Sequence, residues 1–211
     1  MPYQPIELGS LTPPLVRDFI ERKLDRHFLI PARELFKLPR SGCPASANFG
    51  AAITNILVDV VSGISTLTMG ADGKRSGYKF KEILRTCFPW DQEPAPGDPA
   101  ENIELLYESF RNPLAHALRI GPNGEQVKII SPYRRIATGA PRGLYESEII
   151  AIEKRDTRDP AWRRTIVTRS VGATLSLVGM YWGVRTMIKR ATQNQDLMVK
   201  ADEQLSRWKH W

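Results

Sequence analysis

Apolar side chains recur every three or four residues through the front half of the chain, which is the spacing of one buried helix face. Pro31 and Pro39 interrupt the first stretch, and Gly70 with the Asp72-Gly73 turn ends the second. We therefore predict three helices before residue 89. Their apolar positions are Val16, Phe19, Ile20, Leu24 and Phe28, then Ile53, Ile56, Leu57, Val60, Ile64 and Leu67, then Phe80, Ile83, Leu84, Cys87 and Phe88.

Residues 89–99 (PWDQEPAPGDP) contain four prolines and a glycine, and this composition predicts a proline-rich surface connection. A fourth helix is predicted to begin between Asp98 and Glu101, where acidic side chains suit the positive end of the helix dipole. Gly121 is predicted to end it. Its apolar side carries Ile103, Leu106, Tyr107, Phe110, Leu114, Ala117 and Leu118.

The segment 121–160 is predicted to be an insertion with a short β-hairpin in the region 125–153. Asn123-Gly124 marks a turn and residues 126–131 (QVKIIS) suit a short strand, whereas residues 144–153 fit either a strand or a helix. A long helix is predicted over 159–190. A polar terminal helix is predicted over 193–211, anchored by Leu197, Leu205 and Trp208.

These elements predict one mainly α-helical domain over residues 1–211, a helical bundle. The apolar stretch 46–69 carries Asp59 at its centre, and the uncharged stretch 170–184 is shorter than the roughly 20 residues that span a bilayer. Both are therefore expected to be buried helices with no membrane partner. The N-terminus lacks a cationic segment followed by an apolar one, so we expect a cytoplasmic protein without a secretion signal.

Composition adds few constraints on chemistry. Cys43 and Cys87 are too few for a disulfide framework, and their spacing, with only three histidines in the chain, predicts no metal site. The run 70–76 (GADGKRS) lacks the first glycine and the Ser or Thr after lysine that a phosphate-binding loop requires. No cofactor is therefore expected.

The charge is localised. Residues 133–190 contain 12 Lys and Arg against 5 Asp and Glu, whereas the remainder holds 18 of each, so this region accounts for the net charge of +7. A polyanion lying along the region would explain the excess, and a solvated helix surface with paired charges would explain it equally well. The candidate nucleic-acid-binding residues are Arg119, Arg134, Arg135, Arg142, Lys154, Arg155, Arg158, Arg163 and Arg164.

One segment of the fourth predicted helix, ESFRNPLAHAL, carries Arg111, Asn112 and His116, with four residues between the arginine and the histidine. It resembles the R-x4-6-H motif of the HEPN superfamily, all-helical proteins that include many metal-independent ribonucleases, several acting as toxins or in phage defence. The match covers six residues and their place in a late helix. The resemblance implies an endoribonuclease whose catalytic residues are Arg111, Asn112 and His116, with RNA as partner and a homodimer that joins two motifs in one cleft.

The residue types suit this chemistry by themselves. Cleavage of RNA by its 2′-hydroxyl needs a base, an acid and positive charge on the pentavalent phosphorane, and imidazole with guanidinium supplies all three. On a regular helix Arg111 and His116 differ by about 140°, whereas Asn112 and His116 share a face. A kink at Pro113 or a second subunit is therefore needed to bring Arg111 and His116 together.

Alternatives remain open from the sequence. Arg111 could pair with Glu104 or Glu108, and His116 could line the bundle, in a non-catalytic binding or regulatory protein. Nucleic-acid binding without cleavage is a third hypothesis, and an antitoxin or regulatory partner is a further expectation. Gly172, Ser176, Gly179 and Gly183 would give the long predicted helix a smooth face, which suits contact with the same chain or with a second copy.

Overall fold

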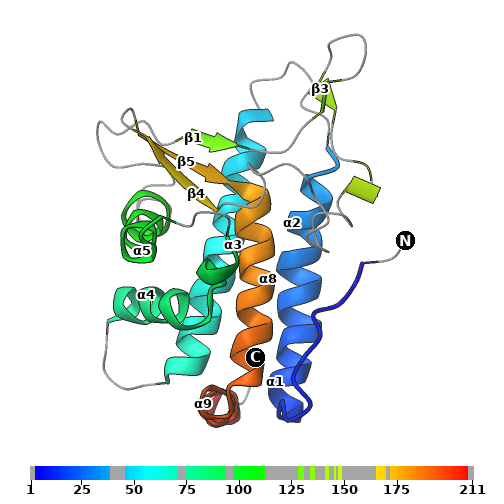
Figure 1. The fold of residues 1–211 in the computed structure, drawn as a ribbon. Helices are drawn as coiled ribbons and strands as arrows, with labels where there is room; N and C mark the ends of the chain where they lie inside the picture. The colour runs from blue at the N-terminus through cyan, green and yellow to red at the C-terminus, as the bar shows by residue number, and fades with distance from the viewer. Residues whose placement is uncertain are drawn as a thin grey trace.

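The computed structural model describes residues 3–38, 46–70, 75–93, 97–112, 128–130, 134–135, 141–142, 145, 147–148, 165–169 and 172–208. Helices dominate these residues, so the predicted mainly α-helical bundle is confirmed. The long helices α3 and α8 pack against each other through the bundle, with a small sheet at one end and α9 near the other (Figure 1).

The N-terminal helical run is longer than predicted. It comprises α1 (Pro14–Asp18), the π-helical segment η1 (Phe19–Leu29) and α2 (Ile30–Leu35), without a break. Pro31 does not interrupt it, because Pro31 lies in the first turn of α2 and the residue before it, Ile30, donates its N–H to the carbonyl of Asp25. The wider π-helical turn therefore accommodates Pro31, which has no backbone N–H to donate, without a break in the helix.

The next two predicted helices are confirmed as α3 (Ser46–Met69) and α4 (Ser76–Cys87). The apolar stripe of α3, from Ile53 to Leu67, is buried between α4, α8 and α9 except at Ile56, which is partly exposed. Residues 50–69 are long and apolar enough to cross a membrane by length and composition alone, and just over half of that stretch is buried inside the fold. A central helix of a soluble bundle has the same character.

The proline-rich segment after α4 is only partly a surface connection. It forms the 3₁₀ turn η2 (Trp90–Gln92), and Trp90 and Glu93 are buried there. The indole of Trp90 donates to the carbonyl of Leu84 at 2.9 Å, and both the backbone N–H and the hydroxyl of Thr165 donate to one carboxylate oxygen of Glu93. The hydrogen bonds of Trp90 and Glu93 hold this irregular segment in the core, and Pro89 is buried as well, so the prediction of a surface connection is wrong at these three positions.

The long helix predicted over 159–190 is wrong at the described residues 165–169 and 172–176. The strands β4 (Ile166–Arg169) and β5 (Gly172–Ser176) form an antiparallel pair there. The strand β1 (Lys128–Ile130) lies within the segment predicted as a strand and pairs parallel with β5. Six of the ten residues from 165 to 174 are β-branched, and such side chains lose rotamer freedom in a helix and fit a strand.

The last helices are α8 (Leu177–Gln193) and α9 (Gln195–Arg207), the second of which confirms the predicted terminal helix. The hydroxyl of Ser176 caps α8 by accepting from the N–H of Gly179 at 3.2 Å. The short strands β2 (Arg134–Arg135) and β3 (Pro141–Arg142) pair antiparallel within the segment predicted to contain a hairpin. At 144–153, Glu148 donates its N–H to the carbonyl of Tyr145, as in a helical turn.

The smooth glycine face is not a helix face. Gly172 and Ser176 belong to β5, and only Gly179 and Gly183 lie on α8. A Cβ at Gly183 would lie 2.0 Å from the ring of Phe88, so this glycine admits a phenylalanine of the same chain. The glycine pattern therefore gives no support to a dimer.

Candidate functional site

The candidate motif begins at the end of a well-anchored helix. Asp98 caps α5 (Pro99–Leu106) by accepting from the N–H of Ala100 at 2.8 Å, which confirms the predicted helix start. Leu106 and Phe110 are completely buried and fix this helix against the core. The helix continues through η3 (Tyr107–Arg111) to Asn112, so it delivers Arg111 and Asn112 together at its last described turn.

The irregularity expected at Pro113 begins one turn earlier. The segment η3 is π-helical, and Asn112 donates its N–H to the carbonyl of Tyr107, five residues back. The arrangement matches that of η1, since each π segment ends two residues before a proline. A proline cannot donate to the carbonyl four residues before it, and a π turn relieves the clash of its ring there. Angles calculated for a regular helix therefore do not apply at Arg111.

Tyr107 forms a platform beside Arg111. Its ring contacts the ring of Phe80 at 6.0 Å between centroids, and the ammonium of Lys81 lies 4.5 Å from its centroid. A Cβ at Gly77 would lie 2.4 Å from the Tyr107 hydroxyl, so the start of α4 accepts this side chain only because residue 77 is glycine. The guanidinium carbon of Arg111 lies 6.0 Å from the same ring centroid.

Arg111 is half-buried, and the ion pair that would make it merely structural is absent from the described residues. Glu104 pairs with Lys81 instead, at 2.6 Å, and Glu108 makes no ion pair within the described ranges. The other half-buried arginines whose side chains the structure describes each make a hydrogen bond or an ion pair, whereas the guanidinium of Arg111 makes neither with any described residue. Its charge is therefore available to an anion.

The charge of Arg111 interacts electrostatically with the carboxyl of Asp59 in α3. Partial burial raises the pKa of its carboxyl above the usual value, and the positive charge of Arg111 partly opposes that shift. Since η3 packs against α3, a carboxyl and a guanidinium from distant parts of the chain share one neighbourhood. From the sequence, Asp59 was evident only as a charge within an apolar stretch. Its proximity to Arg111 was not predicted, because helix periodicity does not show which helix packs against which.

His116 lies outside the described residues, as do Arg119, Lys154, Arg155, Arg158, Arg163 and Arg164. The structure thus describes two of the three predicted catalytic residues, Arg111 and Asn112, and brings them together. Of the predicted nucleic-acid-binding positions, Arg134 on β2 pairs across the ladder with Arg142 on β3, and Arg135 pairs with Pro141. The hairpin therefore gathers three arginine positions of the basic region.

The chain matches no protein-family model, no curated protein and no solved structure. The likeness to the HEPN superfamily consequently rests on the six-residue motif and its helical setting. Within the described ranges, no group of three or more His, Cys, Asp or Glu side chains is placed to hold a metal ion. The thiol of Cys87 is buried, as predicted, and burial raises its pKa.

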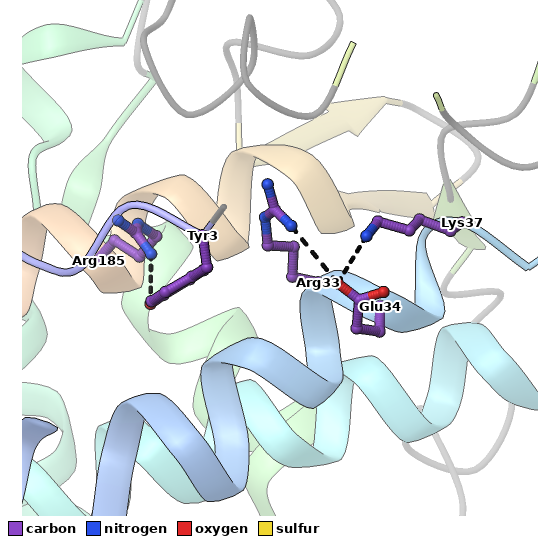
Figure 2. Close-up of polar contacts among 5 residues, drawn as sticks. All are labelled: Tyr3, Arg33, Glu34, Lys37 and Arg185. Carbon is purple, nitrogen blue, oxygen red and sulfur yellow. Dashed lines mark hydrogen bonds and ion pairs between the residues drawn. The ribbon is translucent and has the colours of Figure 1, made fainter. Parts of the chain in front are cut away.

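A buried polar cluster that the sequence did not predict lies beneath the N-terminal segment. The hydroxyl of Tyr3 donates to Asp25 at 2.8 Å and accepts from Arg185, whose other terminal nitrogen donates to the carbonyl of Gln4 at 2.7 Å. Figure 2 shows the Tyr3–Arg185 contact beside the neighbouring side chain of Arg33, which is only 2% exposed. Burial raises the pKa of both Tyr3 and Asp25.

The neighbouring Arg33 is held at the end of α2. Its guanidinium lies 3.4 Å from the Glu34 carboxylate, which also accepts from Lys37 at 2.7 Å, as Figure 2 shows. The cluster joins residues 22 and 182 positions apart, so no local spacing could have revealed it. Its groups are bound to one another, and we assign it to holding the N-terminal segment on the bundle.

Proposed function

We propose that this protein is a metal-independent endoribonuclease of HEPN type that cleaves RNA by attack of the 2′-hydroxyl. The observation that carries the proposal is the half-buried guanidinium of Arg111, which makes no ion pair or hydrogen bond with a described carboxylate, beside Asn112 at the end of a core helix. A salt bridge to Glu104 or Glu108 would have argued for the non-catalytic alternative.

Each residue of the motif has a role in this proposal. His116 takes the 2′-hydroxyl proton or gives one to the leaving 5′-oxygen, because imidazole changes charge near neutral pH. Arg111 stabilises the phosphorane by two donated hydrogen bonds, and Asn112 positions the phosphate or orients His116. Burial against Tyr107 strengthens the field of Arg111 at the phosphate, since nearby water screens it less.

The basic residues and the oligomeric state complete the proposal. Arg119, the β2–β3 arginine positions and the cations between residues 154 and 164 would hold the RNA backbone. Opposed arginine positions repel each other in an antiparallel ladder, and a polyanion relieves that repulsion. We also propose that the protein is a homodimer and acts in the cytoplasm as a toxin or in phage defence. The support for these two proposals is the resemblance to the HEPN motif.

The test compares motif variants with matched controls on the same chain. We expect Arg111→Ala and His116→Ala each to lower the rate of RNA cleavage by about 100-fold or more. The controls are Arg26→Ala and His27→Ala, which change the same residue types at exposed neighbouring positions of η1 and should cleave like wild type. Equal activity in all four variants would overturn the catalytic assignment.

A cellular experiment separates cleavage from binding. Overexpressed wild type should arrest growth and degrade RNA, and His116→Ala should do neither. If the purified protein binds RNA with strong salt dependence but neither arrests growth nor cleaves, the nucleic-acid binder without cleavage is the correct function. If it neither binds nor cleaves RNA, the non-catalytic binding or regulatory protein is correct.

A further inference from the structure

A polar cavity of about 440 Å³ lies along one face of α8 and shares no residue with the motif at Arg111. Trp182, Arg185, Lys189 and Arg190 contribute to its lining from α8, at spacings that place them on one side of the helix. Residues 4–7 of the N-terminal segment and Gln92 of η2 also line it. The cavity is thus built by three parts of the chain that are far apart in sequence.

The charges in the lining are unbalanced. Three cations, Arg185, Lys189 and Arg190, and one carboxylate, that of Glu7, belong to the lining, and Arg185 already donates to the Tyr3 hydroxyl and to the carbonyl of Gln4. Glu7 pairs with Lys189, and the guanidinium of Arg190 donates to both carboxylate oxygens of Asp91 at 2.8 and 2.9 Å. The side chains of Glu7 and Asp91 are 82% and 65% exposed, so these ion pairs are weak and an incoming anion can replace them.

The Glu7–Lys189 pair is the easier of the two to exchange. A single ammonium donor holds Glu7, whereas Asp91 accepts two parallel guanidinium bonds, which are stronger. Release of Glu7 leaves Lys189 free between the two arginines of the same helix face. A phosphate monoester carries up to two charges and three acceptor oxygens, which suits a site with one exchangeable ammonium and two neighbouring guanidiniums.

The volume of the cavity and the Trp182 side chain in its lining indicate a ligand larger than a bare anion. Its volume falls within the range of about 300–1,000 Å³ that is typical of small-molecule sites. From Trp182 to Arg190 is eight residues, or roughly 12 Å along the helix axis at 1.5 Å each. The Trp182 side chain, 7% exposed, lines the cavity one helical turn before Arg185 and adds an apolar ring to the lining.

We propose that this cavity binds a phosphate-bearing ligand of nucleotide size, with the phosphate on Lys189 in place of the Glu7 carboxylate and a ring against Trp182. The site is separate from the proposed nuclease site, so either proposal can fail while the other holds.

The experiment is isothermal titration of the full chain with AMP, inorganic phosphate and adenosine. We expect saturable binding of AMP at one site per chain and no binding of adenosine. Weaker binding of inorganic phosphate than of AMP supports the ring contact with Trp182, whereas phosphate that binds as tightly as AMP would overturn that contact. Adenosine binding as tightly as AMP, or no saturable binding of either phosphate compound, would overturn the proposal.

Three variants, expected to weaken, tighten and leave unchanged the binding of AMP, make the test specific. Lys189→Gln should weaken AMP binding by about tenfold or more, the loss of one charge-assisted hydrogen bond. Glu7→Gln should tighten it by about twofold or more, because it removes the competing carboxylate. Lys200→Gln, at an exposed position of α9, makes the same change of charge as Lys189→Gln and should leave binding unchanged.

Thermal unfolding without ligand verifies that each variant is folded. Weakening by Lys200→Gln equal to that by Lys189→Gln would show general charge attraction and would overturn the proposal. So would an unchanged or lower affinity in folded Glu7→Gln.

Discussion

Two glycine-to-alanine substitutions at different helical positions are expected to change stability in opposite directions. An alanine Cβ at position 183 would lie 2.0, 2.5 and 2.9 Å from three carbons of the Phe88 ring. Carbon atoms pack at about 3.5–4.0 Å, so the ring must retreat by roughly 1.5 Å. That ring is 2% exposed and packs against Trp90 at 4.4 Å between centroids, with the two rings tilted by 38°, which leaves it little room to move.

The magnitude follows from two opposing contributions. Overpacking a core costs about 1–3 kcal/mol, and the size of this clash favours the upper end, whereas alanine gains about 1 kcal/mol over glycine in a helix interior. Gly183→Ala should therefore lower the free energy of unfolding by about 1–2 kcal/mol. Gly63, inside α3, has nothing within 4 Å of its virtual Cβ, so Gly63→Ala should raise it by about 0.5–1 kcal/mol.

Chemical denaturation measures both free energies, and two further measurements complete the test. Adding Phe88→Leu to Gly183→Ala should recover part of the loss, because the smaller side chain vacates the space. The molecular mass in solution should not change in Gly183→Ala, since the contact lies within one chain. A Gly183→Ala protein as stable as wild type, or one with altered mass, would refute the packing described for α8.

Three other substitutions test the polar anchors. Tyr3→Phe removes the hydroxyl that joins Asp25 and Arg185 and should cost about 1–3 kcal/mol of unfolding free energy by denaturation; no loss would contradict a structural role. Burial raises the pKa of Asp25 above its usual 3.8, so its favourable contribution is complete below that pH and is lost as pH rises through the folded-state pKa. The stability of wild type relative to Asp25→Asn should therefore fall across that window, and a rise would contradict the shift. Ser176→Ala removes the cap of α8 and should cost about 1 kcal/mol, whereas equal melting curves would contradict the cap.

Periodicity was a sound guide to the helices and a poor guide to the strands. The apolar stripes predicted α3 and α4, because each lies with one face on the core, and Gly70 correctly marked the end of α3. The uncharged run 170–184 suggested a single helix, yet it combines β5 with the first turns of α8. Ser176 divides the two, and its capping hydroxyl was the available signal. The β-branched residues between 165 and 174, which that prediction did not use, were the better indicator.

The candidate site was predictable only as far as local spacing reaches. The motif located Arg111 and Asn112, and proline chemistry indicated an irregular helix near Pro113. The platform of Tyr107 on Gly77 and the proximity of Asp59 depend on how α3, α4 and η3 pack, which no spacing within one helix contains. The same limit explains why the hydrogen bonds from Arg185 to Tyr3 and Gln4, which lie 182 and 181 positions away, were not foreseen.

The measurement that tests the central claim most directly is the chemical identity of the new RNA end made by the purified wild-type protein in EDTA. Attack by the 2′-hydroxyl with an imidazole and a guanidinium predicts a 2′,3′-cyclic phosphate on the upstream fragment and a 5′-hydroxyl on the downstream one, resolved by mass spectrometry. Intact RNA in EDTA, or fragments ending in a 3′-hydroxyl and a 5′-phosphate, would contradict the account.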